Sequence, residues 1–416
     1  MRILLLFICF LGSTTISYGQ KYLLKPSKVF DGEGVYNNWI VVVGEKEIIY
    51  AGKESGYDFS DPVETIDMEG STLMPGMIEG HSHVLLYPYD QTSWSDQVLK
   101  ESPELRSIRG AKNATKSLMA GFTTIRDLGS EGAGYADVAI KQSIEKGIIK
   151  GPRMLVAGPA IVATGSYGPK GFHDGVQVPL GAEEADLNDI VKVTRRQIGN
   201  GVDFIKVYAD YRWGPNGTAQ PTFSIAELKL MVETAKSSGR YVVAHASTEE
   251  GMRRAILAGV ETIEHGDGGT DAIFQLMKEK NVALCPTLAA GDAISQYRGW
   301  KKGIEPEPER IKNKKASFSK ALKNGVKIVP GGDVGVFEHG SNALELEMMV
   351  EYGMKPLNVL RLATSGNADT FHLGKLGKIK AGFFADIIAV EGDPSKDISD
   401  LRKVHFVMKE GFIYRR

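Results

Sequence analysis

Cysteine is almost absent from this chain. Among 416 residues there are two, Cys9 and Cys285. Cys9 falls in an N-terminal stretch that is predicted below to be removed, and it lacks the small residues expected before a lipid-modified cysteine. Cys285 would then be alone, which excludes an intrachain disulfide. The missing small residues before Cys9 favour a soluble product over a lipid-anchored one.

An excess of charge of either sign is also missing. The chain has 50 Lys and Arg against 51 Asp and Glu, so its formal net charge is −1. This balance gives no reason to expect nucleic acid or an anionic membrane surface as a partner. Hydrophobic and charged contents of 42% and 24% are ordinary globular values. The expected partner is a small-molecule substrate, and a homo-oligomer is left open.

Long hydrophobic runs are limited to one, near the N-terminus. The apolar residues 3–11 are too few to span a bilayer; Arg2 precedes them, and a small-x-small pattern follows at residues 17–19. Together these features predict a signal peptide over residues 1–19 and a secreted or periplasmic protein without a membrane span in its mature form. A buried core helix is the alternative, and the lack of any polar face disfavours it.

A glycine-rich phosphate-binding turn is lacking as well, although residues 75–376 alternate between short apolar strands and helix-like segments. An open doubly wound sheet would need such a turn after its first strand. Eight strand–helix units in about 300 residues predict instead an α/β fold of the (β/α)8 TIM-barrel type. The predicted strands are residues 75–83, 122–127, 153–158, 204–208, 241–245, 262–266, 282–286 and 327–333.

Both ends of the mature chain are rich in β-forming residues. Short runs at residues 22–24, 39–43 and 47–50 are separated by turn signals, and residues 385–390, 404–408 and 411–414 repeat the pattern. Two such ends around a different middle predict one small β-sandwich domain, built from residues 20–74 and 377–416, beside a barrel of residues 75–376.

Chemistry-bearing residues stand where a barrel places its active site, at the C-terminal ends of strands. His81 and His83 are two apart, so on a strand both imidazoles point to the same side. His245, His265 and Asp333 end later strands. Each residue alone has an ordinary explanation as a satisfied polar side chain or a turn residue. Their joint occurrence at the correct strand ends predicts a metal centre.

Lys206 lies among the apolar residues Phe204, Ile205 and Val207 in a predicted central strand. A buried ammonium is costly, and burial favours the neutral amine, which can react with carbon dioxide. The resulting carbamate is an anionic oxygen ligand able to bridge two cations. Four imidazoles, one carbamate and one aspartate suit two divalent metal ions, and the nitrogen ligands favour zinc.

These residues and their surroundings resemble the amidohydrolase superfamily over nearly the whole mature chain. The similarity is carried by the motifs at residues 75–83, 121–127, 205–206, 244–246, 263–266 and 382–386. Residues 344–346, 353–354, 363–364 and 367–368 are similar to the imidazolonepropionase-related branch, which includes Xaa-Pro and Xaa-Arg/Lys dipeptidases. The resemblance implies His81 and His83 on a buried metal, His245 and His265 on an exposed one, Lys206 as bridge, and Asp333 as ligand and base.

The predicted activity is hydrolysis of an amide or peptide bond by metal-activated water, with Asp333 as general base. Tyr208, two residues after Lys206, is predicted either to donate to the developing oxyanion or to pack in the barrel. Tyr167, Tyr211 and Arg212 follow the third and fourth strands and are the candidate substrate contacts, Arg212 for a carboxylate.

Three alternatives remain open. A lactonase or phosphotriesterase would use the same water on a different bond. An imidazolonepropionase-like cyclic-amide hydrolase is disfavoured by Lys206, because the resemblance implies that imidazolonepropionase itself has a mononuclear site without the bridging lysine. A solute-binding protein on an inactive barrel would predict a lost ligand, and every ligand position is filled here.

Overall fold

We describe the fold from a computed structural model that places residues 21–60, 63–173 and 175–416. The predicted signal peptide, residues 1–19, lies outside these described residues. Among them, no helix is both long enough and apolar enough to cross a membrane.

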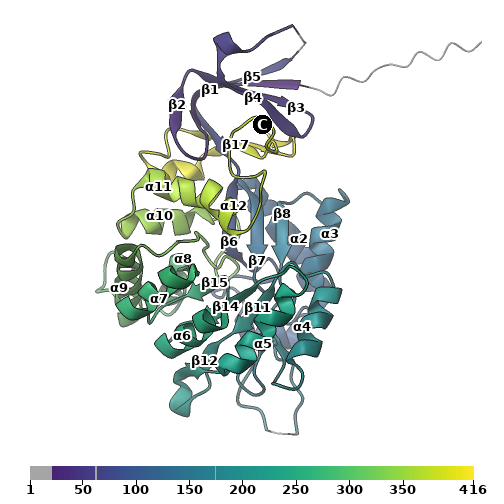
Figure 1. Cartoon of the computed structure of the whole chain (residues 1–416), viewed down its shortest axis with the longest axis vertical. Coiled ribbons are helices and arrows are strands. Elements are labelled where there is room, and N and C mark those ends of the chain that lie inside the picture. The colour runs from purple at the N-terminus through teal and green to yellow at the C-terminus, as the bar shows by residue number, and fades with distance from the viewer. Residues whose placement is uncertain (1–20, 61–62, 174) are drawn as a thin grey trace, which may run out of the picture.

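The two ends of the chain join in one sheet at the top of Figure 1. Strand β5 (Glu64–Pro75) runs parallel to β1 (Lys21–Phe30) and antiparallel to β17 (Ile387–Glu391), so the C-terminal strands are added directly beside the N-terminal ones. The sheet order is β19-β18-β17-β5-β1-β3-β4, and β2 pairs with β1. The remaining strands are β2 (Val35–Asn37), β3 (Trp39–Gly44), β4 (Glu47–Lys53), β18 (Val404–Lys409) and β19 (Phe412–Arg415).

Strands from both ends of the described chain thus pair in one sheet. A sandwich of two separate sheets, as predicted, is not shown. Buried Leu24, Val41, Leu73, Ile387 and Phe406 share one apolar cluster, so both ends contribute to the same small core. Joining the termini this way anchors the entry and exit of the central domain.

The central domain holds parallel strands in two sheets. The first has the order β6-β7-β8, and the second β10-β9-β11-β14-β15-β16. Their bounds are β6 (Met77–Ser82), β7 (Phe122–Asp127), β8 (Arg153–Val156), β9 (Ile161–Val162), β10 (Glu183–Glu184), β11 (Ile205–Tyr208), β14 (Val242–Ala246), β15 (Thr262–His265) and β16 (Ala283–Cys285).

The eighth predicted strand, residues 327–333, is not a strand in the structure. Within it Ile328 makes an isolated bridge with Leu284, and Val334, directly after it, makes one with Ser82, so this segment links the last strand of the second sheet back to the first sheet. Pro330 lacks an N–H group, and Gly331 and Gly332 follow it, so a regular ladder cannot continue there. The arrangement is barrel-like, but a continuous closed ladder is not seen among the described residues.

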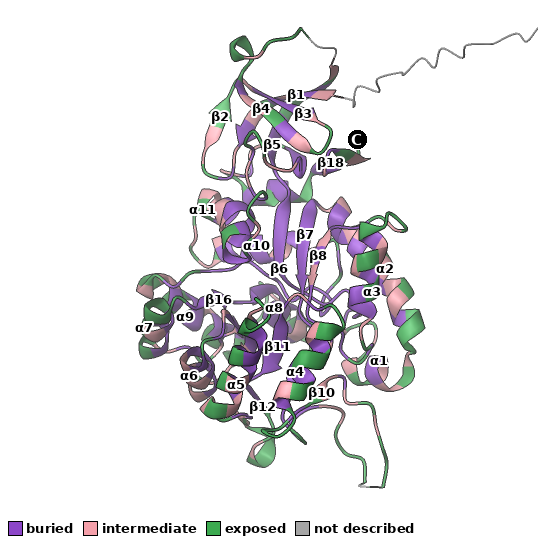
Figure 2. Cartoon of the chain, turned by 45° about the vertical axis from the view of Figure 1, so that its right-hand side comes forward, coloured by how far each residue is buried: buried purple, intermediate pink, exposed green. Residues whose placement is uncertain are grey.

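Helices cover the outside of these strands. In Figure 2 the strands are buried, whereas α4 and α5 show an exposed outer face. A capping box of Ser224 and Glu227 opens α5, and α6 ends at Gly259, which has the left-handed backbone of a C-cap, with φ 92°.

The α-helices are α1 (Trp94–Lys100), α2 (Pro103–Met119), α3 (Ala136–Glu145), α4 (Ile190–Gly199), α5 (Ile225–Lys236), α6 (Glu249–Ala258), α7 (Asp271–Lys280), α8 (Leu288–Tyr297), α9 (Glu309–Asn324), α10 (Ala343–Glu351), α11 (Pro356–Arg361) and α12 (Asn367–Thr370). Shorter turns are η1 (Glu54–Gly56), η2 (Pro215–Gly217), η3 (Leu362–Gly366) and η4 (Ile398–Arg402).

A short β-hairpin follows β11, the fourth of the predicted barrel strands. Strands β12 (Asp210–Arg212) and β13 (Ala219–Pro221) pair antiparallel, with Tyr211 opposite Gln220. Tyr211 and Arg212, two of the predicted substrate contacts, therefore lie on a paired strand. This pairing gives both residues a defined position beside the strand ends.

Candidate metal centre and active-site pocket

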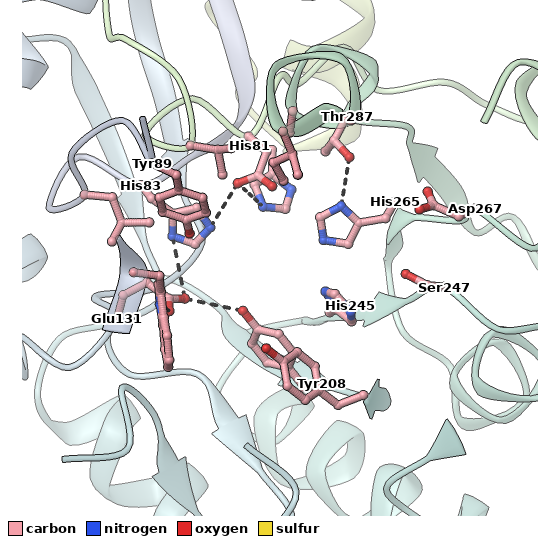
Figure 3. A pocket seen from close by; sticks show the side chains of 18 of the residues that line it. His81, His83, Tyr89, Glu131, Tyr208, His245, Ser247, His265, Asp267 and Thr287 are labelled. Atoms are coloured by element: carbon pink, nitrogen blue, oxygen red, sulfur yellow. Dashed lines mark hydrogen bonds and ion pairs between the residues drawn. The ribbon is translucent and has the colours of Figure 1, made fainter. Parts of the chain in front are cut away.

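All six residues predicted as metal ligands line one cavity of about 230 Å³ at the strand ends. In Figure 3, His81 and His83 lie on one side, and His245 and His265 on another. The elements that bring them together are β6 for His81, β11 for Lys206, β14 for His245 and β15 for His265; His83 directly follows β6, and Asp333 directly precedes the bridged residue Val334.

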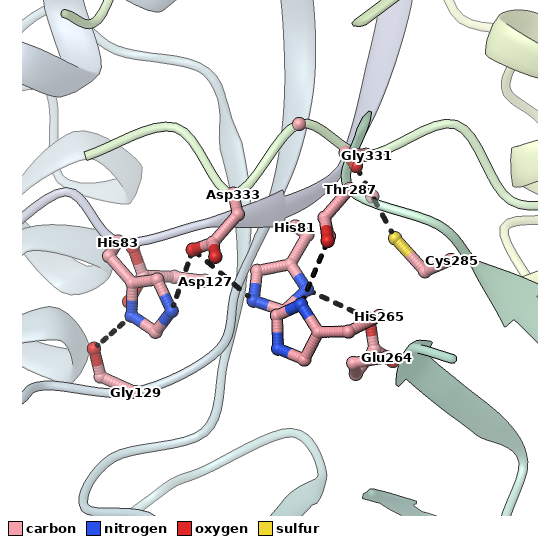
Figure 4. A network of polar contacts seen from close by, with 12 residues as sticks. His81, His83, Asp127, Gly129, Glu264, His265, Cys285, Thr287, Gly331 and Asp333 are labelled. Atoms are coloured by element: carbon pink, nitrogen blue, oxygen red, sulfur yellow. Dashed lines mark hydrogen bonds and ion pairs between the residues drawn. The ribbon is translucent and has the colours of Figure 1, made fainter. Parts of the chain in front are cut away.

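Three of the six converge closely. The Asp333 Oδ1 atom lies 3.6 Å from His81 Nε2 and 3.4 Å from His83 Nε2. One ligand atom from each of these three residues lies within 4.8 Å of the others, which is a spacing that one metal ion could satisfy. All three side chains are buried or nearly so, and Figure 4 shows the carboxylate between the two rings.

Partners behind the rings determine which nitrogen faces the cavity. His81 Nδ1 lies 2.9 Å from Glu264, His83 Nδ1 lies 2.9 Å from the Gly129 carbonyl, and His265 Nδ1 lies 2.8 Å from the Thr287 hydroxyl. Each contact leaves Nε2 for the cavity side, as in metal-binding histidines whose other nitrogen is held by an outer partner.

A buried orphan atom supports a metal at this place. His81 Nε2 has no hydrogen-bond partner among the described residues, although the ring is fully buried. Leaving a polar atom buried and unpaired is costly, and a bound cation would satisfy it. The nitrogen and carboxylate donors present are those that zinc accepts. The residues therefore fit a metal centre.

His245 is held differently. Its Nε2, rather than Nδ1, lies 3.8 Å from Asp210, and its ring stacks on Tyr208 with centroids 4.6 Å apart. Its ring also meets the His265 ring edge-on at 4.5 Å. A ligand role would fall to its Nδ1, and its side chain keeps 18% of its surface exposed.

The neutral form, which a metal ligand needs, is favoured at three of the imidazoles. Burial lowers the pKa of His81, His245 and His265 well below the ordinary value; nearby Lys206 lowers it further at His81 and His245, as His245 does at His265. A neutral ring has one nitrogen lone pair available for coordination.

Lys206 matches the environment expected for it. Only 1% of its surface is exposed, and burial lowers the pKa of its amine, an effect that Glu264 and Asp333 oppose. Among the described residues the amine has no hydrogen bond or ion pair, and it lies 5.5 Å from the centre of the Tyr208 ring. The structure thus places a buried lysine without an ion-pair partner among the described residues in the cavity that the four histidines line.

Two of the candidate ligands sit on strained backbone. His265 has φ 77° and Asp333 has φ 61°, and Thr287, which holds the His265 ring, has φ 49°. Non-glycine residues avoid this left-handed region, at a cost on the order of 1–3 kcal/mol each, and such strain gathers at functional sites. The strain turns His265 and Asp333 out of the strand alternation and toward the cavity.

The predicted substrate contacts also reach the cavity. Tyr167, Tyr208 and Tyr211 form an aromatic wall with ring centroids 4.6 Å apart for the first two and 4.7 Å for Tyr167 and Tyr211. Arg212 lines the same cavity. Tyr208 is therefore both packed in the wall and open to the site, so the two readings of this residue are not exclusive.

Glu131 was not predicted, yet it organises this wall. Its carboxylate accepts hydrogen bonds from Tyr167 Oη at 2.8 Å, Trp94 Nε1 at 2.8 Å and Tyr208 Oη at 3.3 Å. It also lies 3.9 Å from His83 Nδ1. Glu131 stands in a glycine-rich loop with φ 49°, and no periodicity marks such a position.

Glu264 was also missed as a functional residue, although a signal existed. It precedes His265 in the motif at residues 263–266 and forms a fully buried ion pair with Arg126 at 2.9 Å. Arg126 in turn donates to the Gly80 carbonyl at 2.7 Å, directly before His81. Two charged residues inside apolar strands were the available sign of this pair.

Comparison with known proteins identifies the class. The amidohydrolase family pattern matches residues 72–413, and the chain belongs to this family. The similarity predicted from the motifs is thereby confirmed, and the protein is an enzyme of the hydrolase type.

Within this family, the chain is similar in sequence or fold to several characterised hydrolases. The chain is 30% identical to ochratoxinase of Aspergillus niger over 92% of this chain and 84% of that protein. Its fold is similar to that of a Xaa-Pro dipeptidase with bound methionine, with a TM-score of 0.83 and 30% identity over 95% of this chain and 100% of the other. A prolidase complexed with N-methylphosphonate-L-proline has a TM-score of 0.82 and 26% identity over 95% and 100%.

Proposed function

We propose that this protein is an exported, binuclear-metal amidohydrolase that cleaves the amide or peptide bond of a small substrate, in the manner of a dipeptidase. The convergence of His81 Nε2, His83 Nε2 and Asp333, with both rings held from behind, carries this proposal. The similarity to a Xaa-Pro dipeptidase and to prolidase supports the substrate class. Export rests on the sequence of residues 1–19 alone.

In this proposal His81 and His83 would bind one metal ion, with Asp333 as a further ligand, and His245 and His265 would bind the other. Lys206, as a CO2-derived carbamate, would be the ligand that the two ions share. Its unpaired amine and lowered pKa support that chemistry. Zinc is the expected metal because the donors are mostly imidazole nitrogens. When bound, the metals would supply Lewis acidity and lower the pKa of water to about 7.

The chain's own groups then handle the proton and the charge. Asp333 accepts the proton of the attacking water and returns it to the leaving amine. Burial raises its pKa, with His83 and Lys206 opposing the shift, which favours a carboxylate able to hold a proton in transit. Tyr208 donates to the carbonyl oxygen as negative charge develops there. Burial and the nearby Glu131 raise the pKa of Tyr208 well above its usual value, so its proton is retained.

A dipeptide-library assay on purified, zinc-loaded protein tests this function, beside an Asp333→Asn variant and with metal content measured for both. We expect amine release by the parent and a loss of about 10²–10⁴-fold in the variant, the range for general acid–base groups. Turnover of lactones or phosphotriesters without peptides or other amides would reject the amide-bond proposal and leave the metal site standing. Ligand binding without turnover of any of these would favour a solute-binding role.

A further inference from the structure

A second, outer cavity of about 720 Å³ lies over the candidate metal centre and shares several of its lining residues, including Tyr211, His245 and Asp267. We call it the vestibule. Three arginines line it: Arg212 at the end of β12, Arg298 just after α8, and Arg310 in the first turn of α9. A substrate approaching the histidines from this side must pass these three cations.

No carboxylate neutralises these arginines. Among the described residues, Arg212, Arg298 and Arg310 form no ion pair. The vestibule's own acids are occupied, because Asp267 pairs with Lys314. Asp210 is fully buried and accepts hydrogen bonds from the backbone of Ser247 and from Thr248. The vestibule therefore holds three arginines, none of which has a directly paired carboxylate among the described residues.

The position of Arg310 makes this arrangement costly without an anion. It is the second residue of α9, where the helix dipole presents partial positive charge, and Pro308 provides no side-chain cap there. Partial burial lowers the pKa of Arg310; Asp267 opposes that shift, while Arg298 and Arg212 add to it, so the three guanidinium groups influence one another. An anion held among them would relieve this repulsion.

The opposite wall directs an anion to the same side. Glu131 lines the metal-centre cavity beside Tyr208, whose hydroxyl donates to it, and its carboxylate would repel a second one. A substrate with its reacting carbonyl near Tyr208 would therefore extend its negatively charged part toward the vestibule. One α-carboxylate can engage Arg212, which leaves Arg298 and Arg310 for a further acidic group.

We propose, on the basis of the amidohydrolase function above, that the vestibule selects substrates whose leaving group carries two carboxylates. These are dipeptides or N-acyl amino acids that end in glutamate or aspartate. Arg212 binds the α-carboxylate, and Arg298 with Arg310 binds the side-chain carboxylate. The reaction remains hydrolysis, in which water adds to the amide carbonyl, the C–N bond breaks and the acidic amino acid leaves with a protonated amine.

The test compares Ala-Glu with Ala-Gln, which differ only in the side-chain charge, on zinc-loaded protein. We expect kcat/KM for Ala-Glu to exceed that for Ala-Gln at least about tenfold, because charge-assisted hydrogen bonds to a carboxylate are stronger than those to an amide. Arg298→Gln and Arg310→Gln should each bring the ratio toward one. Arg195→Gln, an exposed arginine of α4 that lines neither cavity, is the matched control and should keep the parent ratio.

A binding measurement separates this proposal from the proposed function. Calorimetric titration of the zinc-loaded protein with L-glutamate and L-glutamine requires no turnover. Tighter binding of glutamate, weakened in Arg310→Gln but not in Arg195→Gln, would support the vestibule proposal even if no peptide were hydrolysed. Equal binding of the two, or a kcat/KM ratio near one in the parent, would overturn it whether or not the enzyme hydrolyses peptides.

Discussion

The two histidine pairs of the candidate centre differ in burial and in the polar contacts that hold their rings. His81 and His83 are buried, and both Nδ1 atoms are held at 2.9 Å by Glu264 and by a backbone carbonyl. His265 is held by a single hydroxyl, and His245 has only a 3.8 Å contact to Asp210. In the first pair both rings are therefore oriented by close polar contacts, whereas in the second pair only His265 has such a contact and both rings are partly exposed.

This difference has a functional sense. A rigid, dry half can bind its metal tightly and retain it, because little ordering is left for the binding step. The half nearer the vestibule must admit substrate and release product, so some exposure there is required. The four predictions below test this contrast, beginning with the largest expected effect.

Metal removal should abolish activity, and adding zinc back should show two binding steps of different affinity, one for each histidine pair. After chelation we expect no measurable hydrolysis, because the proposed chemistry depends on the metals. Zinc titration followed by calorimetry should then show two steps, the tighter one belonging to His81 and His83. A His245→Ala variant should lose the weaker step only. Loss of the tighter step in that variant, or two equal sites in the parent, would contradict the contrast.

Removing the buried partner of His81 should damage both stability and metal binding. In Glu264→Gln, Arg126 remains buried without its counter-charge, which costs about 3–5 kcal/mol of unfolding free energy. The His81 ring also loses its orienting carboxylate, and zinc affinity of the tighter step should fall about 10–100-fold. Urea unfolding and zinc titration measure the two effects. Glu261→Gln, on the partly exposed His372 contact, is the control and should change neither.

Replacing the hydroxyl that holds His265 should be milder. Thr287→Val keeps the β-branched shape but removes the 2.8 Å contact to Nδ1. We expect zinc affinity of the weaker step to fall about tenfold, the lower end for outer-shell partners, with the tighter step unchanged. A larger loss than in Glu264→Gln would mean that the His245 and His265 half, and not the buried half, depends more on its outer shell.

Sequence reasoning succeeded where local periodicity carries the information. The two-residue spacing of His81 and His83, and of Lys206 and Tyr208, places each pair on one side of a strand, and the repeated strand–helix pattern puts all of them at one end. Asp333 and His265 were named from strand ends, although their positive φ values break the strand alternation that such reasoning uses.

What sequence reasoning missed depends on long-range packing. Glu131 reaches Tyr167 and Tyr208 from a loop whose course depends on Gly129, with φ 152°, and on its own positive φ. Arg298 directly follows α8 and Arg310 lies in α9, so they line one cavity only in the folded chain. The eighth strand was predicted from apolar residues, but no regular strand forms there. Pro330 lacks the N–H group that a strand ladder needs, and two glycines follow it.

The smallest expected effect concerns a carboxyl group beside the site rather than in it. Burial raises the pKa of Glu345 to about 8, and hydrogen bonds from the backbone of Ala289 and Leu288 oppose that shift. The unfolded carboxyl group titrates near 4.5, so between that value and pH 8 the folded chain keeps a proton that the unfolded chain releases. The contribution is therefore fully present below pH 4.5 and is lost as the pH rises toward 8.

Glu345→Gln imitates the protonated form and should flatten this dependence. Urea unfolding at pH 5, 7 and 9 should show the parent losing stability relative to the variant as the pH rises, by an amount that a single group can supply. Glu347→Gln, on the same helix and paired with Arg402 at the surface, is the matched control and should follow the parent. Parallel curves for the parent and Glu345→Gln would show that Glu345 titrates alike in both states.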